Sequence, residues 1–323
     1  SRTVAPIAIA CLLALAGATS SAAAAPFHQA QSAPATAASA TIEPTLTEII
    51  TMQVERYRRM TVPVTIMGEG PFNFMVDTGA QTTLLSIGLA DQLQLNDRET
   101  ATLVGMASMR TVETTTVPEF HLGDRQLTIR TAPLVEDPEF FGDADGILGL
   151  DTLQDQRVLL DFGAGEMIVS ESLPRGGSRG YDIVVRARER LGQLIIHRAE
   201  LDGISVDVII DTGAQVSIGN LALERRLNRR RMLADSILTD INGEELRSET
   251  RVARRLELGN VRLSEIAISF ADSPVFDTLG LSDRPAMILG MSELRLFDRV
   301  AIDFRSRRVL FDLPDNVGIS RAF

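Results

Sequence analysis

The sequence predicts a mostly β protein built from two homologous lobes related by a pseudo-two-fold axis, with short helices. Three observations lead to this prediction. The chain has 323 residues, which is enough for two domains at roughly 150 residues each. Several segments recur in the same order in its two halves. Short runs of alternating apolar and polar residues, separated by turn residues, are typical of strands.

The repeat centres on an Asp-Thr-Gly-Ala-Gln motif with an apolar lead-in. It occurs in Phe74–Gln81 and again in Val208–Gln215, 134 residues later. Three further pairs follow in order: Phe120–Asp124 with Leu256–Asn260, Gly146–Gly149 with Met287–Gly290, and Val158–Phe162 with Val300–Phe304. One Asp-Thr-Gly has chance odds of roughly one in twenty, but the ordered set falls below about one in ten thousand. The pattern therefore indicates an internal duplication.

Periodicity places similar elements in both copies. In the first copy we expect strands at Thr61–Met67, Phe72–Val76, Arg157–Phe162 and Glu166–Ser170, and a short helix at Ile87–Leu95. In the second copy we expect a helix at Leu221–Leu227 and strands at Ile183–Arg188, Gln193–Ala199, Val206–Ile210, Arg299–Phe304 and Arg308–Asp312.

The first stretch of the chain has the pattern of a targeting signal. Val4–Ala18 is an apolar run of about 15 residues, which is short for a membrane span. Small residues at Ala22 and Ala24 fit an export-signal cleavage site. We therefore predict a signal peptide over residues 1–25 and an exported protein, with an uncleaved membrane anchor as the alternative.

Composition also divides the remaining chain. Residues 26–44 are rich in Ala, Ser, Thr, Gln and Pro, which predicts a flexible segment. An N-terminal lobe is expected over residues 45–173, a Gly/Arg/Ser linker over 174–180, and a C-terminal lobe over 181–323. The pairing of the lobes within one chain predicts a monomer.

Composition excludes several kinds of chemistry. The net charge is −11, which disfavours nucleic acid as a partner. All 32 cationic residues are Arg, so lysine-dependent phosphate binding and Schiff-base chemistry are excluded. With three His and one Cys, we expect no metal site and no cofactor. What the chain has in quantity is carboxylates.

The two matched aspartates suggest a way to use them. A pseudo-two-fold axis would bring Asp77 and Asp211 together at the ends of apolar strands. Two carboxyls about 3 Å apart share one proton, so one can activate a water while the other polarises a carbonyl. Thr78 and Thr212 have hydroxyls that can bond across the lobe interface. Gly79 and Gly213 allow the backbone to approach the carboxyls closely.

At these residues the sequence resembles the retropepsin-like aspartic peptidases, in a single-chain, two-lobe form. The apolar-apolar-Asp-Thr-Gly-Ala turn is similar to that family's catalytic turn, which includes Ala80 and Ala214 here. The apolar-apolar-Gly segments are similar to its second motif, which packs under the turn. They are Ile147, Leu148 and Gly149 in the first copy and Ile288, Leu289 and Gly290 in the second.

The resemblance implies acid-protease-type β-barrel lobes and a metal-independent aspartic endopeptidase that hydrolyses protein substrates. With the export signal it implies a periplasmic enzyme, if the source is bacterial, whose substrates include membrane or envelope proteins. The alternative is a non-catalytic peptide-binding or scaffold module with the same fold. Because the pepsin-type flap tyrosine is absent, Gly105–Ser108 and Asn242-Gly243 are the candidate flap tips.

Overall fold

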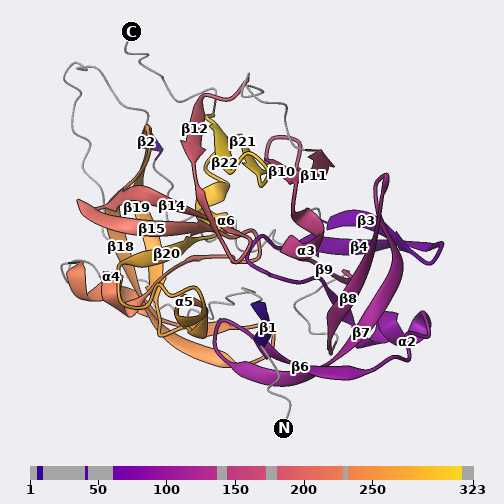
Figure 1. The fold of residues 1–323 in the computed structure, drawn as a ribbon. Helices are drawn as coiled ribbons and strands as arrows, with labels where there is room; N and C mark the ends of the chain where they lie inside the picture. The colour runs from indigo at the N-terminus through magenta and orange to yellow at the C-terminus, as the bar shows by residue number, and fades with distance from the viewer. Residues whose placement is uncertain are drawn as a thin grey trace, which may run out of the picture.

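The computed structural model describes residues 61–136, 144–171, 180–227 and 232–314, together with the backbone of two short N-terminal strands. Those strands are β1 (Pro6–Ile9) and β2 (Thr41–Ile42). Figure 1 shows two β lobes side by side, with a smaller sheet above the junction between them. The rest of the predicted signal peptide and flexible segment lies outside the described residues. So does the predicted linker, apart from Gly180.

The first lobe is a closed barrel of six strands. Its hydrogen-bonded order is β7-β3-β4-β9-β5-β8, and β8 pairs back with β7. The strands are β3 (Thr61–Ile66), β4 (Glu69–Val76), β5 (Leu84–Ser86), β7 (Met109–Leu122), β8 (Arg125–Val135) and β9 (Gly146–Leu148). Another strand, β6 (Glu99–Val104), extends β7 as a hairpin, and β1 pairs with β6. Alternating burial along β3 and β4 points one face of each strand into the core.

The second lobe repeats this topology strand for strand. Its closed order is β18-β14-β15-β20-β16-β19. The strands are β14 (Gln193–Leu201), β15 (Ile204–Ile210), β16 (Ser217–Gly219), β18 (Glu245–Leu258), β19 (Val261–Phe270) and β20 (Ala286–Leu289). β17 (Met232–Thr239) forms a hairpin with β18, β13 (Arg188–Arg190) pairs with β14, and β2 pairs with β19. Matching topology is the structural result of the duplication.

A third sheet joins the lobes. Its order is β11-β10-β21-β22-β12, so two strands of the first copy lie beside three strands of the second. They are β10 (Gln156–Asp161), β11 (Glu166–Glu171), β12 (Ile183–Arg186), β21 (Arg299–Asp303) and β22 (Arg308–Asp312). β10 pairs with β21 in antiparallel register, Leu159 opposite Ala301. One hydrophobic core runs through both barrels and this sheet, which fixes the lobes relative to each other.

Five short helices complete the described fold. They are α2 (Ile87–Gln92), α3 (Leu150–Leu153), α4 (Leu221–Arg226), α5 (Pro274–Thr278) and α6 (Met291–Leu294). α2 and α4 are equivalent, and each begins at a side chain that caps it: Ser86 Oγ accepts from Leu89 N, and Asn220 Oδ1 accepts from Leu223 N. In the part of the chain that is described, no helix is long and apolar enough to span a membrane.

The predicted fold class is confirmed: the protein is mostly β, with two barrel lobes related by a pseudo-two-fold relationship and short helices. Two details differ from the expectation. The expected strand Ile183–Arg188 is broken at Ala187, because β12 pairs with β22 while β13 turns to pair with β14. The hairpins at the end of each copy leave their own barrels and combine in the third sheet, which periodicity along one segment does not encode.

Candidate active site

The two Asp-Thr-Gly turns lie at the ends of equivalent strands, where the lobes meet. β4 runs parallel to β9 and delivers Asp77, and β15 runs parallel to β20 and delivers Asp211. Both aspartates are completely buried. In each turn the inner carboxylate oxygen, Oδ1, accepts two backbone N–H groups: from Gly79 at 2.7 Å and Ala80 at 3.0 Å for Asp77, and from Gly213 at 2.8 Å and Ala214 at 3.2 Å for Asp211.

The two threonines tie the turns to each other. Thr78 Oγ1 donates to Ile210 O at 2.9 Å, and Thr212 Oγ1 donates to Val76 O at 2.7 Å. Each hydroxyl also accepts from the backbone N–H of the other threonine, at 3.0 and 3.1 Å. Four hydrogen bonds therefore cross the lobe interface directly beneath the aspartates, and all are buried.

The glycines of the turns are needed because each faces the opposite carboxyl. A Cβ on Gly79 would lie 2.4 Å from Asp211 Oδ2, and a Cβ on Gly213 would lie 2.4 Å from Asp77 Oδ2. Any side chain at either position would collide with the partner aspartate. The same geometry shows that the outer oxygens of the two aspartates point across the interface toward each other's turn.

Burial raises the pKa of Asp77 well above its ordinary value, and the nearby Asp211 carboxyl raises it further by charge repulsion and by hydrogen bonding. The N–H groups of Gly79 and Ala80 favour the charged form and lower the pKa, but they do not outweigh burial. The protonated form of Asp77 is therefore favoured up to a higher pH than in an exposed aspartate.

The second motif supports each turn from below. Asp77 N donates to Leu148 O at 3.0 Å and Leu150 N donates to Ala80 O at 2.8 Å, so the end of β9 and the start of α3 hold the two ends of the turn. In the other lobe, Asp211 N donates to Leu289 O at 3.1 Å and Met291 N donates to Ala214 O at 2.8 Å. The buried side chains of Ile147 and Ile288 pack beside the turns in equivalent apolar clusters.

Close packing explains the glycine that ends each second motif. A Cβ on Gly149 would lie 2.4 Å from the backbone of Thr82, and one on Gly290 would lie 2.6 Å from Val216 O. Each glycine N–H donates to a hydroxyl that follows the turn by the same interval: Gly149 N to Thr83 Oγ1 at 3.0 Å, and Gly290 N to Ser217 Oγ at 3.1 Å.

Sequence reasoning missed this hydroxyl pair and the carboxyls beneath it. Thr83 and Ser217 are 134 residues apart, the same spacing as the aspartates, so the repeat itself could have identified them. Asp151 accepts from Thr83 in the first lobe, and Glu293 accepts from Ser217 in the second. The two carboxyls do not align in the repeat, so no spacing pattern points to Glu293.

Glu293 is 3% exposed, and burial raises its pKa to about 7 from an ordinary 4.5. Hydrogen bonds from Ser217 and Ser292 favour the charged form and reduce the shift. Ser292 Oγ donates at 2.6 Å. A buried carboxyl with a raised pKa therefore lies under the turn of the second lobe.

Gln193 is another contact across the interface that the sequence did not reveal. Its side chain is fully buried at the start of β14, and Nε2 donates to Gly79 O at 2.6 Å. The carbonyl of Gly79 belongs to the same peptide unit as Ala80 N, which donates to Asp77 Oδ1. A residue of the second lobe thus orients the turn of the first.

The candidate flap tips are the ends of two long hairpins, β6–β7 and β17–β18. Gly105–Ser108 joins the first pair of strands, and Asn242-Gly243 belongs to the turn that joins the second. Gly243 has a φ of +77°, the left-handed conformation that a glycine turn favours. A cavity of about 320 Å³ lies between the second tip and the first lobe, with Arg110 and Glu113 in its lining.

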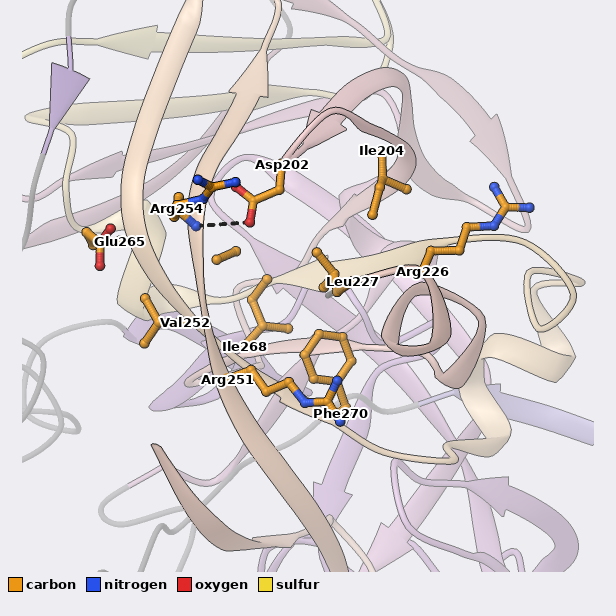
Figure 2. A pocket seen from close by; sticks show the side chains of 11 residues that line it. Asp202, Ile204, Arg226, Leu227, Arg251, Val252, Arg254, Glu265, Ile268 and Phe270 are labelled. Atoms are coloured by element: carbon orange, nitrogen blue, oxygen red, sulfur yellow. Dashed lines mark hydrogen bonds between the residues drawn. The ribbon is translucent and has the colours of Figure 1, made fainter. Parts of the chain in front are cut away.

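A larger cavity, of about 460 Å³, lies on the second lobe and is lined by residues of β18, β19 and the end of α4 (Figure 2). Ile204, Leu227, Ile268 and Phe270 contribute apolar surface. Arg251 stacks on Phe270 and pairs with Glu224 at 2.6 Å. The lining contains no residue of either Asp-Thr-Gly turn, so this cavity is separate from the candidate site.

Within the described ranges, no cluster of three or more His, Cys, Asp and Glu side chains has the arrangement of a metal site. The chemistry available at the turns is that of two carboxyls, backbone N–H groups and hydroxyls.

Comparisons with known proteins agree with the two-lobe arrangement. The family model of a gag-polyprotein putative aspartyl protease matches residues 62–155, and the family model of an aspartyl protease matches residues 197–292. Among solved structures, the chain is similar to a retropepsin-like aspartic protease from Rickettsia conorii. The sequence identity is 20% and the TM-score is 0.27, over 41% of this chain and 89% of that chain. No curated protein matches significantly.

The fold and the paired turns define a two-lobe aspartyl protease architecture, with one Asp-Thr-Gly turn from each lobe. Within that class, the chain carries two aspartyl protease domains in tandem, and a separate family model matches each of them.

Proposed function

We propose that the protein is an exported aspartic endopeptidase that hydrolyses peptide bonds with a water activated between Asp77 and Asp211. The observation that carries the proposal is the contact between two intact, buried turns. The carboxyl of each aspartate faces the glycine of the other turn, and four threonine hydrogen bonds hold the turns together. This arrangement holds two carboxyls that repel each other when ionised close together, which costs free energy. A turn with only a structural role would not require that cost.

The reaction follows from one proton shared by the pair. The ionised carboxyl takes a proton from water as the water oxygen attacks the scissile carbonyl carbon, and the protonated carboxyl donates its proton to the carbonyl oxygen. The tetrahedral diol then breaks its C–N bond. The amine leaves with a proton from one carboxyl, and a diol hydroxyl returns a proton to the other. The pair ends in its starting state, and no covalent enzyme intermediate or metal takes part.

One chain supplies both carboxyls, so we propose that the enzyme acts as a monomer. Its substrates are protein segments in extended conformation, including segments of membrane or envelope proteins. The apolar run with small residues at Ala22 and Ala24 supports export, and periplasmic location if the source is bacterial.

The second candidate is a peptide-binding module that binds peptide beside the same paired turns without catalysis. The second turn keeps Asp211 as well as Gly213, which favours the enzyme, because a binding module has no need to hold two buried carboxyls together. Cleavage of a denatured protein mixture, with the fragments mapped, tests the choice. Wild type should produce fragments and Asp77→Asn should not. Equal fragment patterns from both would overturn the proposal.

A further inference from the structure

The tips of the two long hairpins cross, so that each lies against the other lobe beside its Asp-Thr-Gly turn. β6 and β7 reach across the junction toward α5 of the second lobe (Figure 1). The tip of the β17–β18 hairpin reaches the first lobe, where Ile241 and Asn242 line the same cavity as Val135. The apolar side chains at the two tips are Met106 and Ile241.

Ile241 fills an apolar pocket of the first lobe. It is 4% exposed and belongs to a buried cluster with Ala80, Leu84 and Ile147. Ala80 directly follows the Asp77-Thr-Gly turn, and Ile147 belongs to the second motif under it. The pocket therefore adjoins the position where a scissile bond would lie.

Met106 fills the equivalent pocket of the second lobe. It is 3% exposed and shares a buried cluster with Ala214, Ile218 and Ile288. Ala214 and Ile218 follow Asp211 at the intervals at which Ala80 and Leu84 follow Asp77. Ser273 Oγ donates to Met106 O at 2.7 Å and so fixes this tip to the second lobe.

A buried carboxylate latches the crossed tips together. Asp240 is completely buried and accepts from Ala107 N at 3.0 Å and Ser108 Oγ at 2.8 Å, both on the other hairpin. It also accepts from Asn242 N at 2.9 Å in its own turn. A Cβ at Gly105 would lie 2.3 Å from Asp240 Oδ2, so the first tip can approach this closely only with glycine there.

We propose that Ile241 and Met106 are internal competitors of substrate, which hold the two pockets flanking the paired aspartates until a peptide displaces them. This inference rests on the proposed peptidase function. Both pockets are apolar and each holds one aliphatic side chain, so the displacing peptide carries aliphatic side chains of similar size on both sides of its scissile bond. Peptide binding requires the tips to withdraw. Withdrawal breaks the two hydrogen bonds that Asp240 accepts from Ala107 N and Ser108 Oγ of the first hairpin.

Binding of a peptide that cannot be cleaved tests the inference without turnover. The probe is a hexapeptide in which a hydroxyethylene group, CH(OH)–CH2, replaces the scissile CO–NH, with leucine side chains on both sides. A matched probe carries aspartate side chains there. Isothermal titration calorimetry measures the Kd of each probe for wild type, Ile241→Ala and Met106→Ala. Because the competitor is removed, each variant should bind the leucine probe about tenfold more tightly, equivalent to about 1.4 kcal/mol.

The chain offers matched controls on the same hairpins. Ile237 and Met109 are exposed, at 39% and 66%, so Ile237→Ala and Met109→Ala should bind as wild type does. Ile241→Val removes a single methyl group and should also tighten binding of the leucine probe, but by less than Ile241→Ala. If Ile241→Ala fails to fold, the result with Ile241→Val tests the inference. The aspartate probe should bind no variant well.

A tip that only covers bound substrate predicts the opposite sign, since truncation would then weaken binding. Unchanged or weaker binding by Ile241→Ala or, where that variant does not fold, by Ile241→Val overturns the inference. If tighter binding is found but wild type cleaves no protein, the peptidase proposal fails and the tips gate a peptide-binding module. If wild type cleaves and Asp77→Asn does not, while both tip variants bind as wild type, only the competitor inference fails.

Discussion

Thr78 and Thr212 exchange hydrogen bonds across the lobe interface: the hydroxyl of each accepts the backbone N–H of the other, at 3.0 and 3.1 Å. Each hydroxyl also donates to the carbonyl of the residue before the other lobe's aspartate, Ile210 or Val76. Two separate barrels thereby share one buried polar network. The position of each aspartate is set by the opposite lobe as much as by its own.

Replacing Thr78 with Val should destabilise this network. The variant keeps the volume of the side chain but leaves Ile210 O and Thr212 N buried without their partner, at about 1–3 kcal/mol for each unsatisfied group. Urea denaturation should show a loss of about 2–4 kcal/mol in unfolding free energy. Thr78→Ser keeps the hydroxyl and is the control. Equal stability of the Val and Ser variants would contradict the bridging role.

Asp77→Asn and Asp211→Asn should each abolish cleavage on their own. Both carboxyls belong to one site, so neither lobe can act alone, and kcat/KM should fall by more than roughly a thousandfold. The measurement uses one peptide cleaved by wild type, with the thermal unfolding of each variant as a check on folding. Substantial activity in either variant would mean that the two aspartates do not work as a pair.

The activity profile should be bell-shaped and centred above that of pepsin, whose aspartate pair titrates in a strongly acidic range. Burial and the Asp211 carboxyl raise the pKa of Asp77, so the singly protonated pair persists to higher pH. Ala80 has no hydroxyl to favour the charged form, and Ala80→Ser should shift the acidic limb to lower pH. Measurement of kcat/KM from pH 3 to 8 checks this. An optimum below about pH 3.5 would refute it.

Glu293 should make stability depend on pH between 4.5 and 7. Its pKa rises from 4.5 to about 7 on folding, so the folded protein binds this proton more tightly than the unfolded chain. The stabilisation is complete below pH 4.5, declines as the pH rises, and is lost above about pH 7. The pKa shift corresponds to a change in unfolding free energy of about 3 kcal/mol across this pH range.

Comparison with Glu293→Gln isolates this contribution, because the other titrating groups are unchanged. Unfolding free energies of the variant should vary less with pH over this window than those of wild type. Glu166→Gln, at an exposed position on β11, is the matched control and should follow wild type. If Glu293→Gln shows the wild-type dependence, proton binding at Glu293 does not govern stability.

Cleavage should survive EDTA and reagents that modify serine or cysteine covalently. The only cysteine, Cys11, lies in the predicted signal peptide, and the proposed reaction uses two carboxyls and a water. Peptide turnover is measured before and after treatment. Loss of turnover with EDTA that added zinc or calcium restores would show that the mechanism is wrong.

Much of the fold could be predicted because the sequence contains two copies of the same lobe. Alternating residues located β3, β4, β14 and β15 closely, and the repeated Asp-Thr-Gly-Ala-Gln motif placed both turns at strand ends. The short helices after each turn were also predicted, at Ile87–Leu95 and Leu221–Leu227. These features depend on neighbours in sequence, where periodicity and turn chemistry act.

The contacts across the interface could not be predicted in the same way. Gln193 is hydrogen-bonded to Gly79, 114 residues away in sequence, and Asp240 to Ala107, 133 residues away. No local sequence pattern predicts either contact. The sequence alone suggests an ordinary charged glutamate at Glu293. Burial in the packed second lobe raises its pKa to about 7, and only the tertiary structure shows this. Long-range partners of polar side chains are decided when the barrels come together.

By itself, the sequence determined that this protein has two equivalent β lobes and two matched aspartates, because strand periodicity and turn residues are local and the duplication repeats them. The tertiary structure alone decided that the end hairpins form a shared third sheet, and that each hairpin tip crosses to the opposite lobe. Pairing of strand edges and filling of apolar pockets depend on which surfaces meet in space. These contacts form only when both barrels are closed and packed against each other.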